Sequence, residues 1–60
     1  MKITRDEWIR IHDIFVEEFR AVVELPNRTL EEKEKRAIEG FRAYLRAVKR
    51  VKEELGIRLY

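Results

Sequence analysis

Residues 25–32 of the chain read Leu-Pro-Asn-Arg-Thr-Leu-Glu-Glu, and they divide it into two helical halves. Pro26 cannot continue a helix, because it lacks an amide hydrogen and disfavours helical backbone at the residue before it. Thr29 and Glu32 have the spacing of a capping box, in which each side chain accepts a hydrogen bond from the other residue's backbone amide. The segment therefore predicts a short turn between two helices.

The outer ends of both helices carry signals of the same kind. Thr4 and Glu7 form a second capping box at the start of the first helix. Gly56 supplies the left-handed residue that commonly follows the last turn of a helix. We therefore predict an all-α hairpin with helices over about residues 5–25 and 30–55, forming a single domain over residues 1–60.

A connection this short makes the two helices antiparallel. Gly40 raises the alternative of three helices, but no turn residues surround it, and one glycine costs a helix only about 1 kcal/mol. At about 1.5 Å per residue the second helix is the longer one. We expect it to extend past the first helix, with residues 1–3 against its last turns. Residues 57–60 alternate apolar and polar, which fits a short strand or, as we prefer, a tail that tucks its apolar groups inward.

The composition of the chain indicates that it needs a partner. It has 60 residues, of which 45% are hydrophobic and 43% charged, with no cysteine. Chains this short usually need disulfides, a metal or another subunit for stability. Disulfides and thiolate zinc sites are excluded, and a lone histidine argues against a metal site within one chain. A partner subunit is the remaining option.

The apolar residues of the first helix cover more of its circumference than one neighbouring helix can bury. At about 100° per residue they span an arc of roughly 220°, whereas packing against one neighbour needs about 100°. The predicted oligomer interface consists of Trp8, Ile9, Ile11, His12, Phe15, Val16, Phe19, Val22 and Val23. The residues of the second helix predicted to be buried are Leu30, Ala37, Phe41, Tyr44, Val48, Val51 and Leu55.

The wide apolar arc predicts self-association. A monomer would expose a larger apolar patch than soluble monomers tolerate, and twofold dimers are the commonest closed assemblies. We expect a homodimer that forms an antiparallel four-helix bundle, with a trimer, a tetramer or an unrelated partner as alternatives. Within one hairpin, a tight turn would place Phe15 near Gly40, Trp8 near Ala47, and His12 near Ala43 and Tyr44.

Two polar residues lie within the apolar arc of the first helix. His12 is interpreted as a half-buried histidine paired with Tyr44 or with its own symmetry mate. A pH-sensitive interface or an intersubunit metal site are alternative roles for it. Glu18 is expected to reach Arg36 and to fix the register of the helices rather than to act in catalysis.

The second helix carries a run of cations without an acidic residue between positions 42 and 52, although the net charge of the chain is only +2. Such a run can bind phosphate groups. The candidate nucleic-acid contacts are Arg42, Arg46, Lys49 and Arg50. Two structural roles for the same cations compete with this one: they suit the later part of a helix, and the acidic stripe of the first helix can face them.

Nothing in the sequence indicates an enzyme. There is no serine, the two glycines are far apart, and no catalytic grouping or cofactor motif is present.

No apolar run approaches the ~20 residues of a membrane span, and the first residues lack a signal-peptide core, so we expect a soluble cytoplasmic protein. Heavy use of Glu, Lys and Arg is typical of thermophilic and of designed helical proteins. The predicted function is that of a structural self-assembly module without cofactor or metal, with nucleic-acid binding as the alternative.

Overall fold

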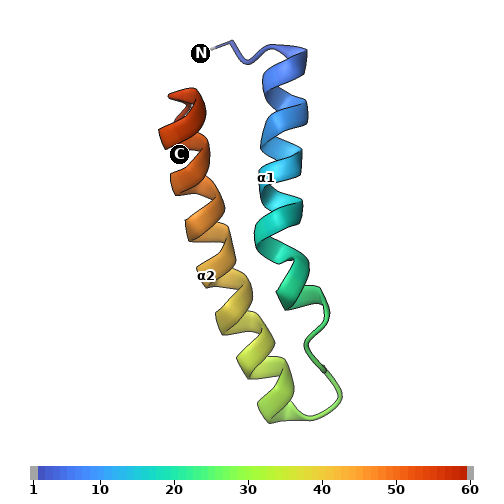
Figure 1. Ribbon diagram of the computed structural model, residues 1–60. Helices are drawn as coiled ribbons and strands as arrows, with labels where there is room; N and C mark the ends of the chain where they lie inside the picture. The colour runs from blue at the N-terminus through green and yellow to red at the C-terminus, as the bar shows by residue number, and fades with distance from the viewer. Residues whose placement is uncertain (1, 60) are drawn as a thin grey trace.

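The computed structural model describes residues 2–59, which form two antiparallel α-helices packed side by side (Figure 1). Helix α1 spans Arg5–Val23 and helix α2 spans Leu30–Leu55. The hairpin is elongated, with Cα extents of 41 × 17 × 15 Å. The predicted all-helical hairpin is therefore confirmed, and α2 runs without a break through Gly40.

Both helices begin at the predicted capping boxes. The Thr4 hydroxyl accepts from the Glu7 amide at 3.2 Å, and the Glu7 carboxylate accepts from the Thr4 amide at 2.9 Å. The corresponding distances between Thr29 and Glu32 are 3.1 and 2.9 Å. Gly56 ends α2 in the left-handed region with φ 68°, which a glycine adopts without steric cost.

Helix α1 ends two residues earlier than predicted, at Val23. The Leu25 amide donates to the Val22 carbonyl at 3.1 Å, which closes a tighter turn than a helical bond does. The early end follows from Pro26, because proline disfavours helical backbone at the residue before it.

The longer helix extends past its neighbour at the loop end, not at the tail end as predicted. In Figure 1 the connection runs from the end of α1 past its last turn to reach the start of α2. At the other end of the hairpin α1 begins slightly beyond the end of α2 (Figure 1), and Arg10, in the second turn of α1, contacts Glu54, one residue before the end of α2. The cause is the six-residue connection 24–29, which is too long for the tight turn assumed from the sequence.

This register changes the facing residues by about two helical turns. A Cβ atom added to Gly40 would meet Val22 Cγ1 at 3.7 Å, so Val22 takes the place predicted for Phe15. Ile14 and Ala47 belong to one core cluster, whereas Trp8, predicted opposite Ala47, is 53% exposed.

Small residues of α2 form its contact with α1. Ala43 and Ala47 are fully buried, and Ala47 packs in one cluster with Ile14 and Val51. Small side chains let two helix axes approach closely, and branched side chains from the other helix fill the space between them. The predicted inward face of α2 was therefore wrong except at its C-terminal end. Residues of that face that lie on the surface instead are Leu30, Ala37, Phe41 and Tyr44.

The two chain ends complete the core at the open end of the hairpin. Ile57 is only 4% exposed and joins the core cluster, against which Ile3, Leu55 and Leu59 also pack. The inward tuck of the tail is confirmed, and residues 2–59 contain no strand. The predicted placement of residues 1–3 is supported at Ile3, while Met1 and Tyr60 lie outside the described residues.

Two substitutions on the small face of α2 test this packing. Gly40→Ala should raise the free energy of unfolding by about 1 kcal/mol, because 3.7 Å is an ordinary contact and alanine favours the helix. Ala47→Leu should lower it by roughly 1–3 kcal/mol through overpacking. Urea unfolding at one fixed protein concentration measures both. An Ala47→Leu variant as stable as the parent would show that this face is not packed.

Candidate functional site

The hairpin has two unlike long faces, one ionic and one apolar. At about 100° per residue, the exposed large apolar residues of both helices project to the same side of the plane through the two axes. The side chains of the interhelical ion pairs project to the opposite side. We define the ionic face as Arg10, Glu17, Glu18, Arg46, Arg50 and Glu54.

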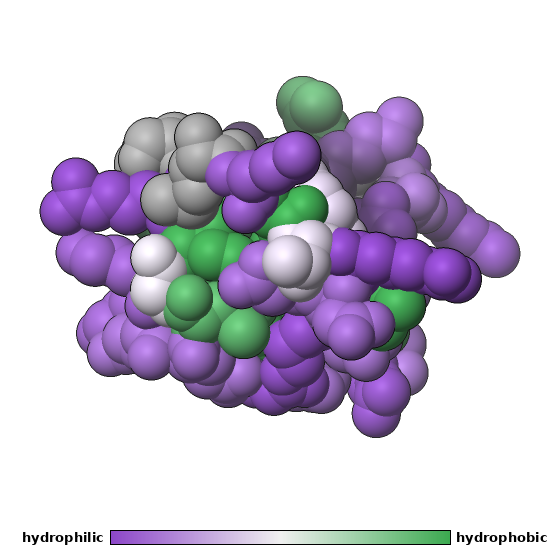
Figure 2. Space-filling model, turned by 90° about the horizontal axis from the view of Figure 1, so that it is seen from above, coloured by the Kyte–Doolittle hydropathy of each residue, from purple (hydrophilic) through white to green (hydrophobic). Residues whose placement is uncertain are grey.

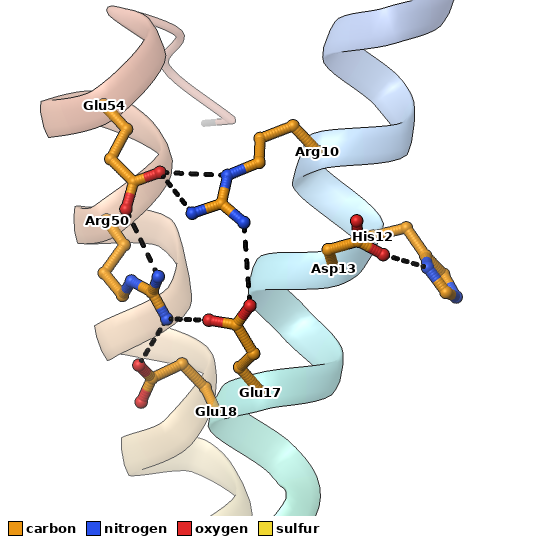
Figure 3. Close-up of polar contacts among 7 residues, drawn as sticks. All are labelled: Arg10, His12, Asp13, Glu17, Glu18, Arg50 and Glu54. Atoms are coloured by element: carbon orange, nitrogen blue, oxygen red, sulfur yellow. Dashed lines mark hydrogen bonds and ion pairs between the residues drawn. The ribbon is translucent and has the colours of Figure 1, made fainter.

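The ionic face joins α1 to α2 through three arginines, two of which Figure 3 shows. Arg10 donates to the Glu54 carboxylate through Nη2 at 2.8 Å and through Nε at 3.1 Å. Arg50 contacts three carboxylates: Glu17 at 3.0 Å, Glu18 at 3.1 Å and Glu54 at 3.2 Å. One guanidinium therefore links two carboxylates of α1 with one of its own helix.

Glu18 is the most enclosed carboxylate of this network. Its side chain is 18% exposed and accepts from Arg46 Nε at 2.9 Å, in addition to its contact with Arg50. The predicted partner Arg36 is wrong: its Nε donates to the Val22 carbonyl at 3.2 Å, at the C-terminal end of α1. Arg36 thus satisfies a carbonyl that the end of a helix leaves unpaired.

The arginines lower the pKa values of their carboxylate partners. The pKa of Glu18 lies below its ordinary value, chiefly because of the hydrogen bond from Arg46 and then that from Arg50, while burial opposes the shift. The pKa of Glu54 is lowered mainly by the hydrogen bond from Arg10. The three carboxylates around Arg50 raise the pKa of its guanidinium.

The basic run of α2 is mostly paired within the chain. Arg46 and Arg50 are held by the ionic face, and Arg42 contacts Glu39 at 3.0 Å. Among the described residues, Lys49 alone of the four predicted nucleic-acid contacts forms no ion pair, and it lines a surface hollow with Lys52 and Arg58. The premise of an unpaired cationic run was therefore wrong. The competing structural role fits instead, because acidic residues of the first helix face Arg46 and Arg50.

The other long face exposes large apolar side chains. Phe41 is 63% exposed, Trp8 53% and Tyr44 37%, and the Tyr44 ring lies 6.1 Å from that of Phe15 on this side of the hairpin. The view along the hairpin in Figure 2 shows hydrophobic side chains in the middle and some also at the outline, among hydrophilic ones. We define the apolar face as Trp8, Ile9, Phe15, Val16, Phe19, Val23, Leu30, Ile38, Phe41, Tyr44, Leu45 and Val48.

Seven of the nine predicted interface residues remain accessible to a partner. Trp8, Ile9, Val16 and Val23 are between 45% and 62% exposed. Phe15 and Phe19 are half-buried and stack on each other with ring centres 6.2 Å apart. His12 completes the seven, whereas Ile11 and Val22 are buried inside the hairpin.

Within a single hairpin His12 is exposed rather than half-buried, and its pairing with a symmetry mate stays a prediction. Its side chain is 74% exposed and its Nδ1 lies 3.4 Å from Asp13 Oδ1 (Figure 3). It lies among the exposed apolar residues of α1, so a partner chain on that face would cover it. Within residues 2–59, no three side chains of the metal-binding types are grouped to hold a metal ion.

Three members of the ionic face were not predicted from the sequence. Arg10, Glu17 and Glu54 were given no individual role, because an exposed charge carries no signal of its partner in the sequence. The available signal was spacing, since Arg46, Arg50 and Glu54 follow each other at intervals of four and so share one side of α2.

No protein-family model matches this chain, and no significant match is found among curated proteins or solved structures. Neither helix, over the described residues, has the length and apolar content to cross a membrane. Function is therefore inferred from the two faces alone.

The pKa shift of Glu18 predicts part of the acid sensitivity of the fold. Because its pKa is lowered in the folded chain, its contribution is complete above the unfolded value near 4.5 and is lost as the pH falls through the folded value. Glu18→Gln should therefore reduce the loss of stability between about pH 5 and pH 3, measured by urea unfolding.

The matched control is Glu53→Gln, which removes an exposed glutamate that forms no ion pair among the described residues. We expect it to retain the parent's dependence on pH. Equal pH profiles for Glu18→Gln and the parent would contradict a role for the Glu18 pairs in stability.

Proposed function

We propose that this chain is a structural self-assembly module, which forms a homodimer by burying the apolar face of one hairpin against that of another. Two hairpins joined in this way make a four-helix bundle. The observation that carries the proposal is the exposure of large apolar side chains from both helices on one side, with Phe41 at 63% and Trp8 at 53%.

The size of the hairpin allows a standard interface. One long side of the whole hairpin, from its Cα extents of 41 and 17 Å, has a projected area of about 700 Å², close to the ~800 Å² per partner that a standard interface buries. Scattered apolar residues would need no partner, but large apolar side chains gathered on one side of a hairpin mark an interaction surface.

The ionic face supports the choice of the opposite side for assembly. Its arginines and glutamates satisfy each other within one chain, as Arg50 does with Glu17, Glu18 and Glu54. Burying these groups in an interface would remove water from charges that gain no better partner. Assembly through the apolar face leaves them in solvent.

A matched pair of substitutions at the end of α1 tests the proposal. Val23 is 62% exposed on the apolar face, and Ala21 is exposed two residues earlier on the side of the ionic face. Val23→Glu and Ala21→Glu add the same charge to the same helical turn. Only Val23→Glu should weaken the dimer, by about 100-fold or more in Kd, because two valines of about 1.5 kcal/mol each leave the interface.

The dissociation constants are measured by light scattering over a dilution series. Equal weakening by both substitutions would indicate an effect of charge on the fold of the hairpin. No weakening by Val23→Glu in a dimeric protein would place the interface elsewhere.

Nucleic-acid binding is the alternative function, and the same hairpin can be tested for it. Arg46 and Arg50 would have to leave their carboxylates to reach phosphates, so the candidate phosphate contacts near the C-terminal end of α2 are the exposed cations Lys49, Lys52 and Arg58, which line one hollow. We expect no retention on DNA or RNA at about 150 mM salt. Retention that falls when Lys49 and Lys52 are both replaced by alanine would favour the alternative.

A further inference from the structure

We propose that the two hairpins of the dimer pack with their loops at the same end, so that α1 of each copy lies against α2 of the other. In this arrangement Phe41 of each copy enters a hollow on α1 of its partner. The inference rests on the proposed self-association and adds the orientation of the second copy.

Face-to-face twofold pairing allows two arrangements, because the axis must lie in the plane of the interface. An axis along the helices places α1 against the partner's α2, with both loops at one end. An axis across the helices places α1 against α1 and α2 against α2, with the loops at opposite ends. The positions of the exposed apolar residues distinguish the two.

Each helix carries a row of exposed apolar residues at the outer edge of the apolar face. On α1 the row is Ile9, Val16 and Val23, spaced by seven residues, and on α2 it is Ile38 and Leu45, also seven apart. A spacing of seven is two helical turns, so each row runs straight along its helix. All five side chains are 41–62% exposed and need cover from outside the hairpin.

The two rows stand at nearly the same height. Glu18 contacts Arg46, and a Cβ atom added to Gly40 would meet Val22 Cγ1 at 3.7 Å. These two contacts give the level of one helix relative to the other. On this register Val16 is close to the level of Leu45. Because the helices are antiparallel, Val23, seven positions further on α1, is likewise close to the level of Ile38, seven positions back on α2.

A twofold axis parallel to the helices keeps each residue of the second copy at the same height as in the first. Val16 therefore meets the partner's Leu45, and Val23 meets the partner's Ile38. An axis across the helices, placed midway between the two levels, instead pairs Val16 with the partner's Val23 and Ile38 with the partner's Leu45. Both axes therefore cover these four side chains, and the two arrangements differ in what faces the surface of α1 between Val16 and Val23: the partner's α2 for an axis along the helices, and the partner's α1 for an axis across them.

A hollow on α1 has the pattern that receives a side chain from a neighbouring helix. Val16, Phe19, Arg20 and Val23 line it, at positions i, i+3, i+4 and i+7, which form the hole of knobs-into-holes packing. Its volume of about 370 Å³ is within the range of ligand-sized cavities, so one aromatic ring fits. Phe41 is near this level on α2 and, in the partner, is the side chain that reaches it.

Disulfide pairing between single-cysteine variants tests the orientation, because the chain has no cysteine of its own. Val16→Cys and Leu45→Cys are mixed, oxidised and analysed by mass spectrometry. We expect the mixed disulfide as the main covalent dimer, at least tenfold over either homodimer. The matched control replaces Val16→Cys with Ala21→Cys, which lies on the other side of α1 and should not cross-link.

A second measurement keeps the test decisive if the disulfide geometry is poor. A spin label on Asn27→Cys marks the loop of each copy. Loops at the same end give a label separation of about 25 Å or less, given helices about 10 Å apart. Loops at opposite ends give about 40 Å or more, the length of the hairpin.

The outcomes separate this inference from the proposed function. A dimer with Val16→Cys linked to itself, or with labels separated by the length of the hairpin, overturns the orientation and leaves self-assembly intact. A monomeric unmodified chain overturns both. The mixed disulfide together with the short separation supports both.

Discussion

The close contact between the small residues of α2 and the branched residues of α1 determines the rest of the structure. Ala43 and Ala47 are fully buried, and Ile14 is fully buried in the same core. Because this narrow face points inward, Phe41 does not and remains on the surface, whereas Leu30 is exposed because α2 extends past the end of α1 at that position. The exposed apolar face is thus a geometric consequence of how α2 is turned.

The same rotation separates polar from apolar chemistry. It places Arg46 and Arg50 beside the carboxylates of α1, so that charges of both helices pair on one side. Exposed ion pairs contribute little stability individually. Their larger effect here is on recognition. Charges that are already paired within the chain form no better interaction with a partner, whereas burial of the apolar side chains on the opposite face is favourable.

Local signals in the sequence predicted the elements of the fold well. The capping boxes at Thr4 and Thr29 and the glycine at position 56 define helix ends through contacts within three or four residues. The inward tuck of Ile57 likewise follows from its distance of one residue from that end.

The relations between the helices were harder to predict. The register depended on the length of the connection, which Pro26 increases by ending α1 early. The inward face of α2 was assigned to its largest apolar residues, whereas close packing selected Gly40, Ala43 and Ala47. Periodicity reports how apolar residues are arranged on a helix, but it cannot say which of two adjacent faces meets the neighbour and which meets another chain.

Both the function and the orientation proposed for this chain depend on a second copy covering its apolar face. Sedimentation equilibrium of the unmodified chain at micromolar concentration tests that assembly most directly. We expect a mass of twice 7.4 kDa with a helical circular dichroism spectrum. A folded, helical species of 7.4 kDa that stays soluble as its concentration rises would contradict it.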